Sequence, residues 1–125
     1  MKPEELMIGD WVSYNDKMSC KITALCKNRP VFDTLLGYQD YSVPYEKLKP
    51  IPLTPEILEK NGFELQRDKS ELGTLDTYWL GSELGAFRIH RLNNGDYQFG
   101  LAKIRDVHEL QHALRLCGID KEITI

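Results

Sequence analysis

The pattern of hydrophobic and polar positions in the first fifty residues indicates short strands joined by turns. The segment 18–26 alternates, which predicts a strand with one buried face formed by Met18, Cys20, Ile22, Ala24 and Cys26. Further runs of strand length, separated by turn residues or proline, lie at 10–14, 31–36 and 38–43. Such closely spaced strands predict a small SH3-like β-barrel or a curled sheet over residues 1–50.

The pattern changes at Thr54, where the sequence predicts the start of a helix. Thr54 suits the N-cap, Pro55 suits the first helical position and Asn61-Gly62 supplies a stop, so this helix should span about 55–61. Strands are predicted after it at about 63–66, 75–80, 86–92 and 96–102, followed by a helix at about 107–117. Residues 51–125 should therefore form an α-β-β-β-β-α part with an antiparallel meander, which makes the whole chain an α+β protein.

The turn around Asn94-Gly95 fixes the register of one predicted hairpin. A two-residue loop would pair Ile89 with Gly100 and mix polar with apolar side chains on each face. A three-residue loop beginning at Asn93 pairs Ile89 with Phe99 and keeps the faces distinct. The predicted apolar face then consists of Phe87, Ile89, Tyr97, Phe99 and Leu101.

Composition excludes several classes of protein. The 125 residues include 16 basic and 19 acidic ones, a net charge of −3, and 42% are hydrophobic, which is typical of a globular protein of one or two small domains. Neither half is strongly charged, so bulk charge does not support binding to nucleic acid or anionic lipid. No apolar run approaches the roughly 18 residues of a membrane span, and no signal peptide is visible. We therefore expect a cytoplasmic protein.

The cysteines agree with that compartment. Cys20, Cys26 and Cys117 are odd in number and form no C-x-x-C pair or metal-like spacing. We expect them to be reduced and to pack as small hydrophobic side chains.

The segment His108-Glu109-Leu110-Gln111-His112 matches the H-E-x-x-H pattern of zinc proteases. Histidines four residues apart on a helix can share a metal, while the glutamate activates a bound water as general base. A catalytic zinc also needs a third protein ligand, and Arg115 and Gly118 stand where the extended pattern has its glycine and third histidine.

The helical phase of this segment also argues against zinc. At 100° per residue, His108 and His112 lie on the flank away from the apolar stripe of Val107, Leu110 and Leu114, so we expect them to face solvent. We expect no catalytic residue, metal or other cofactor. A zinc hydrolase with His108 and His112 as ligands and Glu109 as base remains an alternative.

Aromatic residues are concentrated in the first half of the chain. They are Trp11, Tyr14, Phe32, Tyr38, Tyr41 and Tyr45. Some must fill a small core, yet neighbours on a strand cannot both face inward, so we expect Trp11 or Tyr14 to be exposed. The predicted binding surface consists of Trp11, Tyr14, Tyr38 and Tyr41.

Three segments resemble an uncharacterised family of small proteins from Bacteroidetes and their phages or prophages. They are Glu5-Leu6-Met7-Ile8-Gly9-Asp10-Trp11-Val12, the stretch from Ile51 to Phe63 (IPLTPEILEKNGF), and Val107-His108-Glu109-Leu110-Gln111-His112. The resemblance runs in order along the whole chain and is most specific in the middle segment. It implies a cytoplasmic accessory protein, compatible with an origin in a mobile element, and transfers no catalytic residue.

These observations favour a non-catalytic binding or adaptor module. A protein partner or self-association fits the aromatic surface and the net charge of −3, which offers little affinity for phosphates. The alternatives are the zinc hydrolase and a nucleic-acid-binding accessory protein of a mobile element. No membrane partner is expected.

Overall fold

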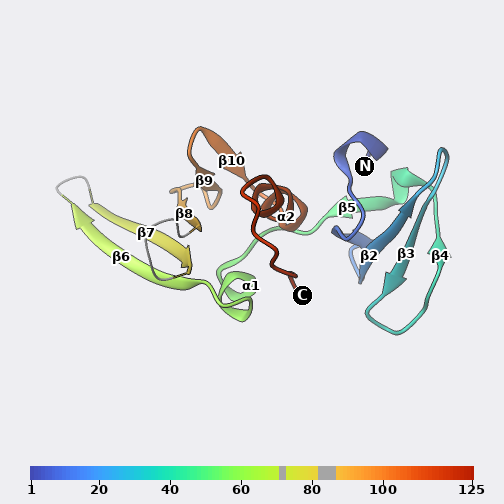
Figure 1. The fold of residues 1–125 in the computed structure, drawn as a ribbon, viewed down its shortest axis with the longest axis horizontal. Coiled ribbons are helices and arrows are strands. Elements are labelled where there is room, and N and C mark those ends of the chain that lie inside the picture. The colour runs from blue at the N-terminus through green and yellow to red at the C-terminus, as the bar shows by residue number, and fades with distance from the viewer. Residues whose placement is uncertain (71–72, 82–86) are drawn as a thin grey trace. The chain divides into compact units, whose positions relative to one another are not determined.

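The computed structural model describes residues 1–70, 73–81 and 87–125 (Figure 1). Contacts divide the chain into two compact units, one made of Met1–Pro52 with Asp106–His112 and the other of Leu53–Arg105 with Ala113–Ile125. Each unit contains a five-stranded antiparallel sheet, so the chain is an α+β protein, as predicted. The first residues of the last helix group with the first unit, whereas the sequence assigned the whole helix to the second part.

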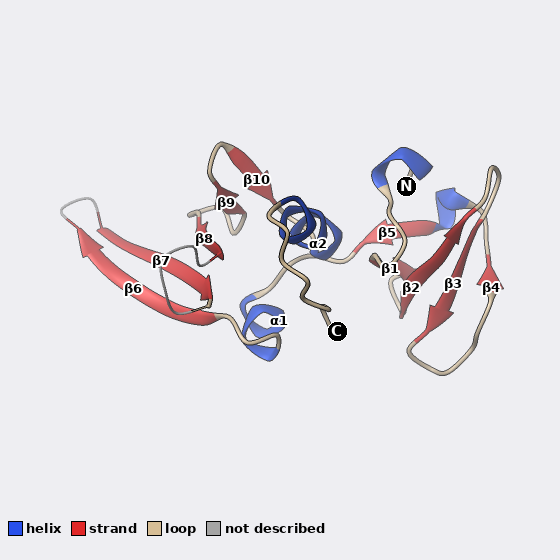
Figure 2. Cartoon of the chain, in the orientation of Figure 1, coloured by secondary structure: helices blue, strands red, loops and turns tan. Residues whose placement is uncertain are grey.

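The first unit is built around a meander of short strands (Figure 2). Its elements are η1 (Pro3–Glu5), β1 (Trp11–Tyr14), β2 (Met18–Leu25), β3 (Pro30–Thr34), β4 (Tyr41–Ser42), η2 (Tyr45–Lys47) and β5 (Leu48–Pro50). The strand order is β4-β3-β2-β1-β5, so β4 and β5 form the two edges and the described strands do not close into a barrel.

The inner face of this sheet forms the core of the first unit. The buried cluster consists of Leu6, Val12, Cys20, Ile22, Phe32, Val43, Tyr45 and Leu48. The alternation predicted for β2 holds at Cys20 and Ile22, but a register shift between Ile22 and Ala24 disrupts it, and Cys26 is exposed. Such a bulge adds a residue to one strand and turns the following side chains away from the regular pattern. Cys117 is also exposed, so Cys20 alone of the three cysteines packs in a core.

The second unit combines a helix, a second meander and the end of the last helix. Its elements are α1 (Pro55–Lys60), β6 (Glu64–Ser70), β7 (Gly73–Leu80), β8 (Phe87–Arg91), β9 (Tyr97–Phe99) and β10 (Ala102–Ile104), and α2 (Val107–Leu116) begins in the first unit. The sheet order is β10-β9-β8-β7-β6, in which sequential strands are neighbours. Residue 86, where the sequence predicted a strand to start, lies outside the described residues.

The start of α1 has the predicted chemistry. Thr54 Oγ1 accepts a hydrogen bond from the Ile57 N–H at 3.3 Å, and Pro55 follows at the first helical position. The chain leaves the helix through Gly62 at φ +85°, a conformation that L side chains rarely adopt. Buried Asn61 donates to the Thr124 carbonyl and accepts from the Thr124 N–H, both at 2.8 Å, which ties the C-terminal segment to α1.

The hairpin register is confirmed, but the second strand is shorter than predicted. His90 pairs with Gln98 and Arg91 with Tyr97, which is the register of the three-residue loop. Phe87, Ile89 and Tyr97 are buried on one face. The single strand predicted over 96–102 is wrong: it breaks at Gly100, where φ is +56°, and β10 folds back onto β9. Leu101 therefore lies in a turn and is fully exposed.

Candidate functional site

Three tyrosines form a contiguous surface on the first unit. The Tyr41 ring lies 6.5 Å from the rings of both Tyr14 and Tyr38, measured between centroids, and 5.7 Å from the buried ring of Phe32. Tyr38 is 61% exposed and Tyr41 44% exposed, whereas Tyr14 is half-buried against the core. Tyr14, Tyr38 and Tyr41, called the tyrosine cluster below, are three of the four residues predicted for the binding surface.

Trp11, the fourth residue predicted for that surface, is only 8% exposed. The expectation that it offers its ring to solvent is therefore wrong. It alternates with Val12, which faces the core of the first unit, so Trp11 projects from the opposite face of β1. Its backbone N–H donates to Gln111 Oε1 at 2.9 Å, which shows that the last helix covers β1 at this residue.

The β3–β4 hairpin that carries Tyr38 and Tyr41 also carries exposed leucines and two aspartates. Leu35 and Leu36 lie in the turn that leads from β3 toward Tyr38, and both side chains are exposed. Asp40 directly precedes Tyr41, and its N–H donates to the Asp33 carboxylate at 3.2 Å. The cluster thus stands beside an edge strand, next to exposed leucines and two carboxylates.

The two histidines of the H-E-x-x-H segment do not face solvent, which corrects the prediction from helical phase. His108 is 7% exposed, and the side chain of His112 is 27% exposed. His112 Nε2 lies 2.7 Å from Oδ2 of fully buried Asp10 in the turn before β1. Gln111, between them on the same side of α2, donates to the Gly9 carbonyl at 2.8 Å. Single-face reasoning failed because this part of the helix has a second buried face, against the turn before β1.

Asp10, His108, Gln111 and His112, called the histidine cluster below, form a buried polar group inside the first unit. Asp10 Oδ2 also accepts a hydrogen bond from the Met7 N–H at 2.8 Å. The rings of the two histidines meet edge to face, with centroids 5.6 Å apart. Because buried polar groups cost free energy unless they are paired, the hydrogen bonds of Asp10, Gln111 and His112 stabilise the docking of α2 on β1. Buried His108 Nδ1 has no hydrogen-bond partner among the described residues.

The geometry gives the zinc alternative no support. Among residues 1–70, 73–81 and 87–125, no group of three His, Cys, Asp or Glu side chains is arranged to hold a metal ion. His112 Nε2 is engaged by Asp10, and Glu109 is half-buried on the same helix. The contacts that the structure shows for this cluster join the start of α2 to the turn before β1.

The pH dependence of stability is expected to report on His108. Burial is the main cause that lowers its pKa, and His112 adds to the effect, while the carboxylates of Asp10, Glu109 and Glu5 oppose it. An unfolded histidine has a pKa near 6.5, so the unfolded chain binds this proton more readily than the folded chain. The contribution of His108 to the free energy of unfolding should be fully present above pH ~6.5 and decrease as pH falls toward the lower folded pKa. Urea unfolding at several pH values between about 5 and 8 measures this loss.

A His108→Gln variant is expected to lose less unfolding free energy on acidification than the wild type, because it cannot take up the proton. His90→Gln is the matched comparison, since His90 lies in the second unit and contacts Thr77 Oγ1 through Nδ1 at 2.9 Å. A smaller pH dependence of stability in His90→Gln, together with a pH dependence in His108→Gln equal to that of the wild type, would contradict the assignment.

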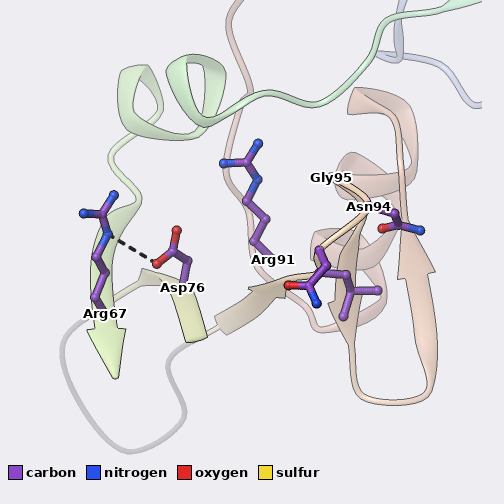
Figure 3. A pocket seen from close by; sticks show the side chains of 7 residues that line it. Arg67, Asp76, Arg91, Asn94 and Gly95 are labelled. Carbon is purple, nitrogen blue, oxygen red and sulfur yellow. Dashed lines mark ion pairs between the residues drawn. The ribbon is translucent and has the colours of Figure 1, made fainter. Parts of the chain in front are cut away.

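The second unit contains a cavity of about 820 Å³ (Figure 3). Its lining consists of Arg67, Asp76, Arg91, Leu92, Asn93, Asn94 and Gly95. In the sheet, Arg67 on β6 lies opposite Asp76 on β7. Thr77 on β7 pairs with His90 on β8, and the same register places Asp76 opposite Arg91. Two arginines therefore flank one carboxylate in a row across three strands.

Of the two arginines in this row, Arg67 forms an ion pair with Asp76. Arg67 Nε lies 3.3 Å from Asp76 Oδ1, the ion pair drawn in Figure 3. The Arg91 side chain makes no ion pair or hydrogen bond with a residue that the structure describes. The sequence alone does not single out any of these three residues, because the alternation that places them on one face becomes informative only once the strand register is known.

Comparisons with protein-family models, curated proteins and solved structures gave no match to this chain. Within the described residues, no helix has both the length and the apolar character that crossing a membrane requires. The tyrosine cluster, the histidine cluster and the cavity are the features of the structure that bear on function.

Proposed function

We propose that the protein is a non-catalytic binding module that holds an extended segment of a partner protein on its tyrosine cluster. The observation that carries this proposal is the continuous set of ring contacts from Tyr14 through Tyr41 to Tyr38, each at 6.5 Å between centroids, in which Tyr41 and Tyr38 are exposed. Rows of exposed aromatic rings bind extended, proline-containing peptides, because the rings supply flat apolar area at low cost in side-chain entropy.

The charges near the tyrosine cluster favour a particular partner chemistry. The carboxylates of Asp33 and Asp40 lie on the hairpin that carries Tyr38 and Tyr41, and they would repel phosphates. The same carboxylates attract arginine or lysine, and a guanidinium also stacks favourably on a tyrosine face. We therefore expect the bound segment to combine proline or aliphatic residues with basic ones, and we favour protein over nucleic acid as the partner.

The architecture of the first unit is compatible with an SH3-like module, and we include that assignment in the proposal. The support is the meander order β4-β3-β2-β1-β5, with the short helix η2 leading into β5 where it returns to β1. Fold alone does not establish function, so the proposal depends on the tyrosine cluster.

Selection from a random-peptide library on the full chain tests the partner chemistry. Enriched peptides should contain basic residues beside proline or aliphatic ones. In fluorescence titrations, a Tyr38→Ala/Tyr41→Ala variant should bind the selected peptides at least about tenfold more weakly, because each ring removed takes away exposed contact area. Both residues are exposed, so the variant should keep the unfolding midpoint of the wild type within a few degrees.

A Leu101→Ser variant is the control, since Leu101 is an exposed apolar residue of the second unit. It should bind the selected peptides like the wild type. Equal affinity of the tyrosine variant and the wild type would reject the cluster as the site. Salt-sensitive binding of a single-stranded oligonucleotide that needs the same tyrosines would instead favour the nucleic-acid alternative, and a dimer in light scattering that the tyrosine variant loses would favour self-association.

A further inference from the structure

We propose that the cavity of the second unit binds a phosphorylated small molecule. This inference is independent of the tyrosine cluster, because every residue that lines the cavity belongs to the second unit. It rests on the two arginines, on the turn that forms part of the lining and on the size of the space.

The arginines present the donors that a phosphate requires. Asp76 holds Arg67 through one nitrogen, Nε, and the terminal nitrogens of the guanidinium remain as further donors. Arg91 brings a second guanidinium, which forms no ion pair within 4 Å with a carboxylate of the residues that the structure describes. The row Arg67–Asp76–Arg91 thus has a net charge of +1, in a chain whose net charge is −3.

The turn after β8 forms the opposite wall with polar groups held in place. Asn94 Oδ1 accepts from the Asp96 N–H at 3.0 Å, and Asn94 Nδ2 donates to Asp96 Oδ2 at 3.2 Å. Arg105 Nε contacts the same carboxylate oxygen at 3.3 Å, so the charge of Asp96 is matched outside the lining. Gly95 continues the turn at φ +91°, with no atom within 4 Å of the position that a Cβ would occupy.

The dimensions fit an extended phosphate ligand better than a lone ion. Strands two apart are separated by roughly 10 Å, so Arg67 and Arg91 approach a ligand from two sides. A phosphate ester carries a charge of about −1.5 to −2 and three acceptor oxygens. It therefore matches two guanidinium groups better than a carboxylate ligand, which has one charge and two oxygens. The cavity of about 820 Å³ is in the range that encloses a small organic molecule.

Titration of the full chain with pyrophosphate, followed by NMR of the backbone amides, tests the inference. Saturable shifts are expected at Asn94 and Gly95. An Arg91→Gln variant should bind pyrophosphate at least about tenfold more weakly, the change expected for loss of a charge-assisted hydrogen-bonded pair. Arg67→Gln should also weaken binding, which keeps the test valid if the other variant does not fold.

Arg88→Gln is the matched control, because Arg88 lies on the same strand with its guanidinium 5.3 Å from the centre of the Trp79 ring, on the face opposite Arg91. Its pyrophosphate affinity should equal that of the wild type. The inference is overturned if pyrophosphate does not bind saturably, if Arg88→Gln weakens binding as much as Arg91→Gln does, or if citrate, a carboxylate probe, binds as tightly as pyrophosphate.

Discussion

An Asp10→Ala variant is expected to lose about 1.5 to 3 kcal/mol of unfolding free energy, the range for losing hydrogen bonds to a charged group. Asp10 is fully buried and accepts from the Met7 N–H, and His112 Nε2 lies 2.7 Å from the same oxygen. Removing the carboxylate leaves both groups without this partner in a region with little access to water. Urea unfolding followed by circular dichroism measures the loss.

Asp16→Ala is the control for that experiment. Asp16 forms an ion pair with Lys49 at 3.0 Å, but both side chains are largely exposed, so its removal should cost less than about 1 kcal/mol. If Asp10→Ala is too unstable to fold in buffer, Asp10→Ala, His112→Ala and the variant with both substitutions can be compared by urea unfolding in a stabilising osmolyte. The second substitution should add less than its separate effect, since the two residues share one contact. Equal losses for Asp10→Ala and Asp16→Ala would contradict the role given to the histidine cluster.

The second large effect is expected from Trp11→Ala, which should cost about 3 to 5 kcal/mol because it removes a large buried ring. Trp11 is only 8% exposed, so nearly all of its surface is buried. Tyr38→Ala, which removes a ring that is 61% exposed, should change the unfolding free energy by no more than about 0.5 kcal/mol. Guanidinium unfolding followed by circular dichroism compares the two variants without relying on tryptophan fluorescence.

Comparing these two variants distinguishes an aromatic ring that stabilises the fold, Trp11, from one that binds the partner, Tyr38. Trp11→Ala should destabilise the chain, and Tyr38→Ala should affect peptide binding alone. A Trp11→Ala variant as stable as the wild type would show that the ring does not contribute to the packing of β1.

Local chemistry made several elements predictable from the sequence. The N-cap at Thr54, the left-handed stop at Gly62 and the loop that sets the Ile89–Phe99 register each depend on residues close together in the chain. The break at Gly100 was missed because an apolar pattern continues through Leu101, and only the left-handed backbone of the glycine turns the chain there.

Contacts between distant residues could not be predicted in the same way. His112 contacts Asp10, about a hundred positions earlier, and a helix examined alone shows a single apolar stripe. One signal was present in the sequence: Asp10 stands among apolar residues directly before a strand, and a buried carboxylate needs a partner. Burial of Trp11 was missed for the same reason, because alternation gives the face of a strand but not what covers that face.

The histidine cluster also affects the order in which the chain can fold. Its hydrogen bonds join residues that are 100 and 102 positions apart, whereas β1 to β5 pair within the first fifty residues. Local pairings of the meander close short loops and form quickly, but the contact with α2 must wait for a much longer loop to close. During synthesis on the ribosome, the first sheet can therefore assemble while Asp10 still lacks His112, and the first unit is complete only after His112 has emerged.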